Sequence, residues 1–318
     1  MIIANPIYDV VFKRLMENLR VAKFFIGTLL DETIIDLSLN NREISVLPHG
    51  ENLDREMLDT IEKQLLDRLS ISVVRVDFVA TIKSEDGSHK KVLIEVQKAK
   101  NSLDVMRFRE YLAEHYKIED EIDIDGTKHK TALPIVTIYM LGFKISEIES
   151  AAIKVKRDYW DLIKNEAVIG KSAFVESLTH DCYVVQIPRI VGNTRTRLEM
   201  LLSLFEQKYF LTDRKIIKQY NYPVDNDVIQ EMLSILEYVA SDEDLRKKIE
   251  DEHDAYRLLE IMAENRKKEL EAKIKAMGDA LADANQTITE QNQTIEKKDQ
   301  ALAAKDAEIE ALRKKLGL

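Results

Sequence analysis

The sequence predicts an α/β protein in three parts: a mixed α/β domain over residues 1–190, a helical subdomain over 191–262 and a coiled-coil tail over 263–318. Three observations support this fold class. Two β-type runs joined by a polar turn lie between residues 73 and 98, amphipathic helical patterns dominate the later half, and a seven-residue apolar repeat begins near residue 264. At 318 residues the chain is also longer than a typical single domain.

The composition is that of a folded but acidic protein. Hydrophobic residues make up 45% and charged residues 33%, and the formal net charge is -10 at pH 7. Proteins that bind DNA through many phosphate contacts are usually basic, because the release of counterions drives their affinity. The composition therefore argues against extensive charge-driven DNA binding, but is compatible with a local positive groove and a metal ion.

Cysteine usage and hydropathy suggest the compartment. The single cysteine, Cys182, rules out an intramolecular disulfide framework and lies in an apolar run, which favours a packing role. The first residues lack the basic segment and long apolar core of a secretory signal. No window approaches the roughly 18 consecutive apolar residues of a membrane helix. We expect a cytoplasmic protein that does not enter a membrane.

The first element predicted is a helix that starts at Pro6 and is capped by Asn5, because proline is favoured at the first helical position. Ile7, Val11 and Leu15 recur at helical spacing and predict its buried face.

Further elements precede the two β-type runs. Asp9 and Lys13 lie one helical turn apart, which is compatible with a simple ion pair or with a functional role. A second helix is expected over residues 20–30, a short strand over 44–47 and a charged helix over 54–69.

The two β-type runs each carry one acid in apolar surroundings. Side chains on a strand alternate between its faces, so Asp77 lies among valines on a strand whose two faces both look covered. In the second run Glu95 and Gln97 point to the same face. The polar turn between the runs predicts a hairpin, which brings Asp77 and Glu95 together.

Two interpretations of these acids remain open from the residues alone. Converging carboxylates share a proton or bind a cation, and Mg²⁺ or another hard divalent cation prefers oxygen ligands. Such a site activates water against a phosphodiester. Alternatively, Asp77 and Glu95 form ion pairs with Arg75, Lys91 or Lys98, as many half-buried acids do.

The order of three motifs resembles the PD-(D/E)XK nuclease superfamily. Asp77 is followed after about eighteen residues by Glu95-Val96-Gln97, and then by a helix with Arg107 and Tyr111 in an R-x-x-x-Y pattern. The segment 5–16, N-P-I-Y-D-V-V-F-K-R-L-M, resembles the opening motif of one branch, the PD-(D/E)XK nuclease family transposases or recombination-promoting nucleases. The resemblance implies a restriction-endonuclease-like core.

The resemblance also implies roles for individual residues. Asp77 and Glu95 match the two acids that bind the metal, and the carbonyl of Val96 matches a backbone ligand. Gln97 stands where the superfamily has a catalytic lysine, as is common in this branch. Asp9 corresponds to an acid that the first core helix often contributes to the metal site.

Phosphate binding is assigned to Arg107 and Lys13. A guanidinium group holds phosphate with a bidentate fork, which makes Arg107 a better replacement for the missing lysine charge than Lys98, whose side chain points to the opposite strand face. The alternative for Arg107 is an ion pair on the helix surface with Glu110 or Glu114.

After the hairpin we expect a helix over residues 102–117, a solvated acidic turn over 119–126, a central strand over 134–143 and a last strand over 183–188. The acidic turn lacks the ligand spacing of an EF-hand calcium loop.

Helices are expected over residues 197–205 and 208–219 and around 228–239. Ser241 is predicted to cap the helix that follows.

The tail carries apolar residues seven positions apart, with no proline to interrupt it. The first seam is Ile274, Leu281, Ile288, Ile295, Leu302, Ile309 and Leu316, and the second is Leu270, Met277, Ala284, Gln291, Lys298, Lys305 and Leu312. This repeat predicts a coiled coil that forms a homo-oligomer.

The resulting hypothesis is a metal-dependent DNA endonuclease that hydrolyses phosphodiester bonds and promotes recombination or transposition. The alternative is a catalytically inactive nuclease-like domain that binds nucleic acid or protein and is oligomerised by its coiled coil. A purely structural coiled-coil scaffold is a third option, but it leaves the acid pair unexplained.

Overall fold

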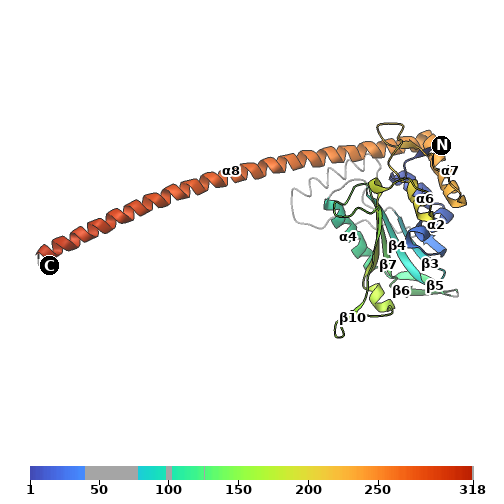
Figure 1. The fold of residues 1–318 in the computed structure, drawn as a ribbon, viewed down its shortest axis with the longest axis horizontal. Coiled ribbons are helices and arrows are strands. Elements are labelled where there is room, and N and C mark those ends of the chain that lie inside the picture. The colour runs from blue at the N-terminus through green and yellow to red at the C-terminus, as the bar shows by residue number, and fades with distance from the viewer. Residues whose placement is uncertain (40–77, 98–101, 125, 317–318) are drawn as a thin grey trace. The chain divides into compact units, whose positions relative to one another are not determined.

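A six-stranded mixed sheet forms the centre of the part of the chain that the computed structural model describes, residues 1–39, 78–97, 102–124 and 126–316 (Figure 1). From edge to edge its strands are β2 (Ile34–Leu39), β3 (Phe78–Ser84), β4 (His89–Gln97), β7 (Ile135–Leu141), β11 (His180–Gln186) and β8 (Ala152–Val155). Strands β4, β7 and β11 are parallel, while β3 is antiparallel to β2 and β4, and β8 to β11. The predicted α/β class is confirmed.

The β3–β4 hairpin forms as predicted. Its described ladder begins at the pair Phe78 and Ile94. In the turn, the amide of Ser84 donates to the carbonyl of Ser88 and the amide of Gly87 donates to that of Ser84, both at 2.9 Å. Gly87 has a φ of 83°, which glycine adopts without steric cost and other residues rarely do.

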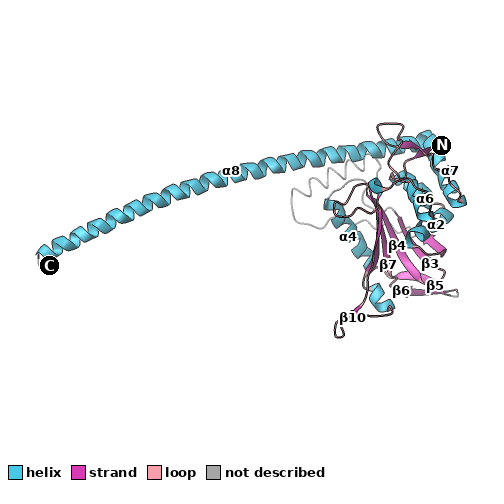
Figure 2. Ribbon diagram, in the orientation of Figure 1, coloured by secondary structure: helices cyan, strands magenta, loops and turns pink. Residues whose placement is uncertain are grey.

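Helices cover the two faces of the sheet unequally (Figures 1 and 2). One face packs in a large apolar core with α1 (Asp9–Met16), α2 (Leu19–Leu30), α6 (Arg197–Ser203) and α7 (Asp227–Ser241). The other face packs against α4 (Ser102–Lys117) in a smaller cluster. Strand alternation explains the division, because Val92 and Ile94 belong to the large core and Leu93 to the small one.

Helix α4 connects the parallel strands β4 and β7, as such strands require a crossover. Its bounds are those predicted from the sequence, and β7 lies within the predicted strand 134–143. The helices of the predicted subdomain share the large core, in which Leu201 of α6 and Leu236 of α7 are fully buried.

The predicted N-terminal helix start is wrong. Residues Ile2–Ala4 form β1, which pairs antiparallel with β12 (Ile217–Gln219), and α1 begins only at Asp9. The side chain of Asn5 is buried, and its amide donates to Gln207 Oε1 at 3.0 Å and to the carbonyl of Lys215 at 2.9 Å. Pairing with β1 also makes residues 217–219 a strand, so the helix predicted over 208–219 does not form.

Three smaller expectations are also corrected. The acidic segment forms the β5 (Asp120–Ile124) and β6 (Thr127–Thr131) hairpin, not a solvated turn. Strand β11 is not the last, because β12 follows it. The cap before α8 (Glu243–Leu316) is Asp242, whose Oδ1 accepts from the amide of Leu245 at 2.9 Å, while the Ser241 hydroxyl bonds within α7.

The short elements between β8 and β11 are β9 (Trp160–Asp161), β10 (Glu166–Ala167) and α5 (Ala173–Ser177), and the 3-10 helix η1 (Ile187–Arg189) follows β11. The predicted strand 44–47 and helix 54–69 lie outside the described residues.

The chain divides into two units, residues 1–257 and 258–318. The part of helix α8 (Glu243–Leu316) from residue 258 onward lies in the second unit, in which the apolar residues of the predicted heptad repeat between Leu270 and Leu312 are exposed. Within the described residues, no helix has both the length and the apolar character needed to cross a bilayer.

Candidate active site

Glu95 lies near the end of β4, which is the second strand of the β3–β4 hairpin and precedes the crossover to β7. Its side chain is buried, with 6% of its surface exposed, and strand alternation places it with Leu93 on the face covered by α4. Gln97 follows two residues later on the same face and is half-buried. The carbonyl of Gln97 accepts from the amide of Gly142 at 2.6 Å, which fixes the end of the strand.

The neighbour of Glu95 across the sheet is Tyr139, its register partner on β7. The Tyr139 ring lies 4.1 Å from that of Phe108 on α4, between ring centroids. Burial raises the pKa of the Tyr139 hydroxyl, and the nearby charges of Cys182 and Glu95 raise it further. The Glu95 carboxylate therefore lies beside aromatic groups in a weakly polar environment, where charges interact strongly.

A buried ion pair lies on the same strand face. Lys91 Nζ contacts Asp120 Oδ1 at 2.6 Å, and both side chains are almost fully buried. Lys91 Nζ also donates to the carbonyl of His115 at 3.3 Å. Burial lowers the pKa of the His115 imidazole to about 4, and the Lys91 charge contributes to the shift. Lys91, one of three ion-pair partners considered for the strand acids, is thus held by Asp120.

Asp9 and Lys13 form the i,i+4 ion pair that their spacing predicts, with 2.8 Å between Oδ2 and Nζ. The amide of Asp9 donates to Glu252 Oε1 at 2.9 Å, so a carboxylate from α8 satisfies the first turn of α1. Within the described residues, the buried Asp9 Oδ1 has no hydrogen-bond partner.

The structure does not bring Asp9 to Glu95. Helix α1 packs in the large core with Ile94 and Val96, whereas Glu95 projects toward α4. The Asp9 carboxylate accepts from Lys13 Nζ, and the Asp9 backbone amide donates to Glu252, on the side of α1 that meets α8. Val96 itself is buried in the large core.

Two of the predicted site residues are not described. Asp77 lies outside the described residues, as does the side chain of Arg107, whose backbone belongs to α4. Among the described residues, no group of three or more His, Cys, Asp or Glu side chains is arranged to hold a metal ion. The predicted Asp77–Glu95 pairing therefore remains a prediction.

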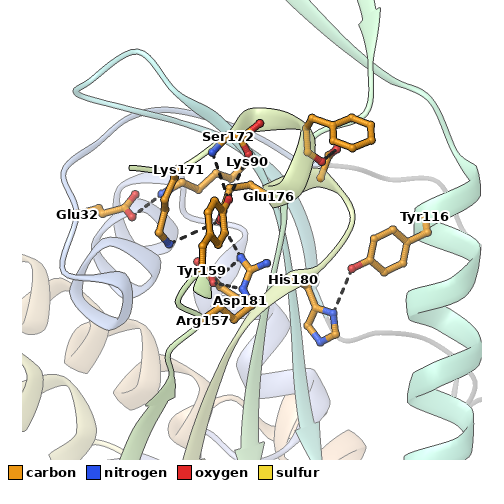
Figure 3. A network of polar contacts seen from close by, with 12 residues as sticks. Glu32, Lys90, Tyr116, Arg157, Tyr159, Lys171, Ser172, Glu176, His180 and Asp181 are labelled. Carbon is orange, nitrogen blue, oxygen red and sulfur yellow. Dashed lines mark hydrogen bonds and ion pairs between the residues drawn. The ribbon is translucent and has the colours of Figure 1, made fainter. Parts of the chain in front are cut away.

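Sequence reasoning missed a polar network at the N-terminal end of β11, where the strand begins with His180 and Asp181 (Figure 3). Arg157 Nη2 contacts Asp181 Oδ1 at 2.7 Å and Glu176 Oε2 at 2.9 Å, and the Tyr159 hydroxyl donates to Glu176 Oε1 at 2.6 Å. The guanidinium of Arg157 is thus neutralised by two carboxylates. This arrangement anchors α5 and the segment around β9 to the sheet.

The same region is joined to α4. The Tyr116 hydroxyl and His180 Nδ1 are 3.2 Å apart (Figure 3). Burial lowers the pKa of His180, and the nearby Arg157 charge lowers it further. The cluster of charged and aromatic residues at 157–161 was the available sequence signal, but its partners lie about twenty residues away, beyond the reach of a local pattern.

Comparison of the chain with protein-family models, with curated proteins and with solved structures found no match.

Proposed function

We propose that residues 1–257 form a metal-dependent DNA endonuclease that hydrolyses phosphodiester bonds, with Glu95 and Gln97 in its active site. The observation that carries this proposal is a buried carboxylate, Glu95, at the end of a central strand, with Gln97 two residues later on the same covered face. A carboxylate held in a weakly polar environment beside titratable groups is a functional-site candidate, because such surroundings strengthen its interaction with a cation.

The succession of elements supports the same proposal. Among the described elements, a helix is followed by the mutually antiparallel neighbours β2, β3 and β4, then by the crossover helix α4 and the parallel strand β7. This is the order that a restriction-endonuclease-like core with a PD-(D/E)XK site on its hairpin needs.

The residues fit a hard divalent cation in ligand type, since the proposed donors are carboxylate and carbonyl oxygens. Asp77, Glu95 and the Val96 carbonyl would hold Mg²⁺, which when bound polarises phosphate and lowers the pKa of water. Gln97 then orients water or phosphate through its amide, without supplying charge. Arg107 on α4 binds the phosphate backbone with its guanidinium fork.

Asp9 and Lys13 have a different place in the proposal. Their ion pair lies on the α1 side of the sheet, so we propose that Lys13 contributes to phosphate binding only at a distance from Glu95. Asp9 lies on the α1 side as well, away from Glu95, so we assign it no part in holding the same metal ion.

A second candidate function is a silent nuclease-like module that binds DNA or protein. The net charge of -10 and the amide in place of a catalytic lysine favour it. In either case we propose that the tail assembles the protein into a homo-oligomer.

The decisive experiment is cleavage of plasmid and linear DNA by the purified full chain with Mg²⁺ or Mn²⁺, with EDTA as a control. Glu95→Gln preserves the shape of the side chain, and Glu166→Gln removes an exposed carboxylate on β10 as a matched control. We expect cleavage by the parent and by Glu166→Gln, and a loss of at least 100-fold in Glu95→Gln.

Titration calorimetry with Mn²⁺ gives a readout independent of turnover. Binding by the parent that is lost in Glu95→Gln, without cleavage, would select the silent module. No cation binding and no cleavage by a folded parent would refute the proposed metal site.

A further inference from the structure

The second unit of the chain presents a long apolar stripe to solvent. Along α8, Ile274 is 69%, Leu281 64%, Ile288 53% and Leu302 61% exposed. Each aliphatic side chain of this size gains roughly 1.5–3 kcal/mol when it is fully buried. A helix with this stripe therefore gains most by packing the stripe against a partner helix.

The heptad positions along the stripe differ in kind. Counting Ile274 as position a, every a position from 274 to 309 is isoleucine or leucine. Position d changes along the helix, from Met277 and Ala284 to Gln291, Lys298 and Lys305. The apolar character of the seam is thus concentrated in a, and the polar character in d.

We propose that the occupant of this stripe is a second copy of the chain, and that the two helices are parallel and in register. This inference rests on the oligomer proposed above and specifies its partner and geometry. In that arrangement a faces a, so each isoleucine or leucine packs on its own copy. An antiparallel pair would instead place a against d, and Lys298 and Lys305 would face isoleucine or leucine.

Charge complementarity supports the same register. In a parallel pair, the hole that receives a d side chain includes the partner's e residue, which directly follows its own d residue. The e residues after the two lysines are Asp299 and Asp306. Each lysine can bury its stem in the seam and reach an aspartate of the other copy, as long basic side chains do. The polar d residue Gln291 is likewise followed by Asn292.

The end of the helix adds one more pair. Glu308 occupies position g, and Arg313, five residues later, occupies position e. In a parallel, in-register coiled coil these two positions meet between the helices. The register therefore brings opposite charges together at the C-terminal end as well as in the middle.

Cysteine cross-linking tests the relative orientation of the two helices. Cys182 is the only native cysteine, so a single substitution removes every competing thiol. In a Cys182→Ser background, Met277→Cys at a d position and Ile309→Cys at an a position are made separately in the full chain and oxidised with copper phenanthroline. We expect each single variant to form a covalent dimer, since in a parallel, in-register pair both a and d residues face their own copies. Cross-linking only in a mixture of the two variants, between a d residue and an a residue, would establish an antiparallel pair and overturn the proposal. A monomer by sedimentation equilibrium would overturn it too.

A charge reversal tests the role of the aspartates. The double variant Asp299→Lys with Asp306→Lys should raise the dimer dissociation constant at least about tenfold. Asp279→Lys with Asp283→Lys makes the same charge change on the outer face and should alter it less than about threefold. Equal effects of the two variants would refute the specific pairing. None of these readouts involves DNA, so they stand or fall apart from the nuclease proposal.

Discussion

The two faces of the central sheet differ in the chemistry that they bury. The face toward α1, α2, α6 and α7 is lined by apolar side chains such as Ala80, Ile82 and Val92. The face toward α4 has a small apolar cluster around Leu93, and carries the Lys91–Asp120 ion pair on the same face. Burying these polar groups costs free energy unless each is paired.

Because of this difference, the stability of residues 1–257 depends mainly on one face of the sheet and their proposed chemistry on the other. The apolar face supplies most of the burial, since its core runs from Ile3 to Ile249. The α4 face keeps charged and titratable groups in a weakly polar environment, where pKa values shift and ligands bind strongly. We therefore expect substitutions on the first face to change the free energy of unfolding, and those near Glu95 to change activity.

The largest expected effect is on the apolar face. Phe25 packs on Phe12 and Phe205, with ring centroids 5.6 and 5.9 Å away. Phe25→Ala leaves a cavity among these rings and should lower the free energy of unfolding by about 4 kcal/mol. Urea denaturation followed by circular dichroism measures it. A loss below about 1 kcal/mol would show that this core is not closely packed.

The next effect tests the buried ion pair on the α4 face. Lys91→Met leaves the Asp120 carboxylate buried without its cation and should cost about 3 kcal/mol. Lys91→Met combined with Asp120→Leu should recover most of that loss, because a buried ion pair is often no better than an apolar pair. If the double variant is as unstable as the single one, the pair has a net stabilising role.

The pKa of His115, on helix α4 beside Lys91, makes the free energy of unfolding depend on pH. Its pKa in the folded protein is about 4, below the ordinary value of 6.5, because the imidazole is buried and lies near Lys91. The unfolded chain therefore takes up the proton first, and stability present above pH 6.5 is lost as the pH falls toward 4. Between pH 8 and 5 the loss should be about 2 kcal/mol. In His115→Gln this part of the pH dependence should disappear.

Local patterns were enough to predict several elements of the fold. The hairpin turn at Gly87, helix α4 and strand β7 depend on periodicity and turn residues within a short window, and all three form. The placement of Glu95 and Gln97 on one strand face follows from the same alternation.

Long-range pairing could not be predicted in this way. Strand β1 pairs with residues 217–219, about two hundred positions away, and this pairing overrides the helical pattern of 208–219. The position of Asp9 relative to Glu95 likewise depends on which face of the sheet α1 covers. A helical pattern reveals that a face is buried, but not the surface that buries it.

The smallest expected effect on stability concerns Glu95 itself. Glu95→Gln keeps the shape and most of the hydrogen-bonding capacity of this buried side chain, because the amide oxygen of glutamine still accepts hydrogen bonds. We expect the free energy of unfolding to change by less than about 1 kcal/mol, even where cation binding and cleavage are lost. Glu206→Gln is the matched comparison, because the equally buried Glu206 accepts from the amide of Gly192 at 2.9 Å and contacts Lys208 at 3.0 Å. Removing that charge should cost about 1–2 kcal/mol. If thermal denaturation shows the opposite order, Glu95 stabilises the fold and the separation of the two faces fails at its most important residue.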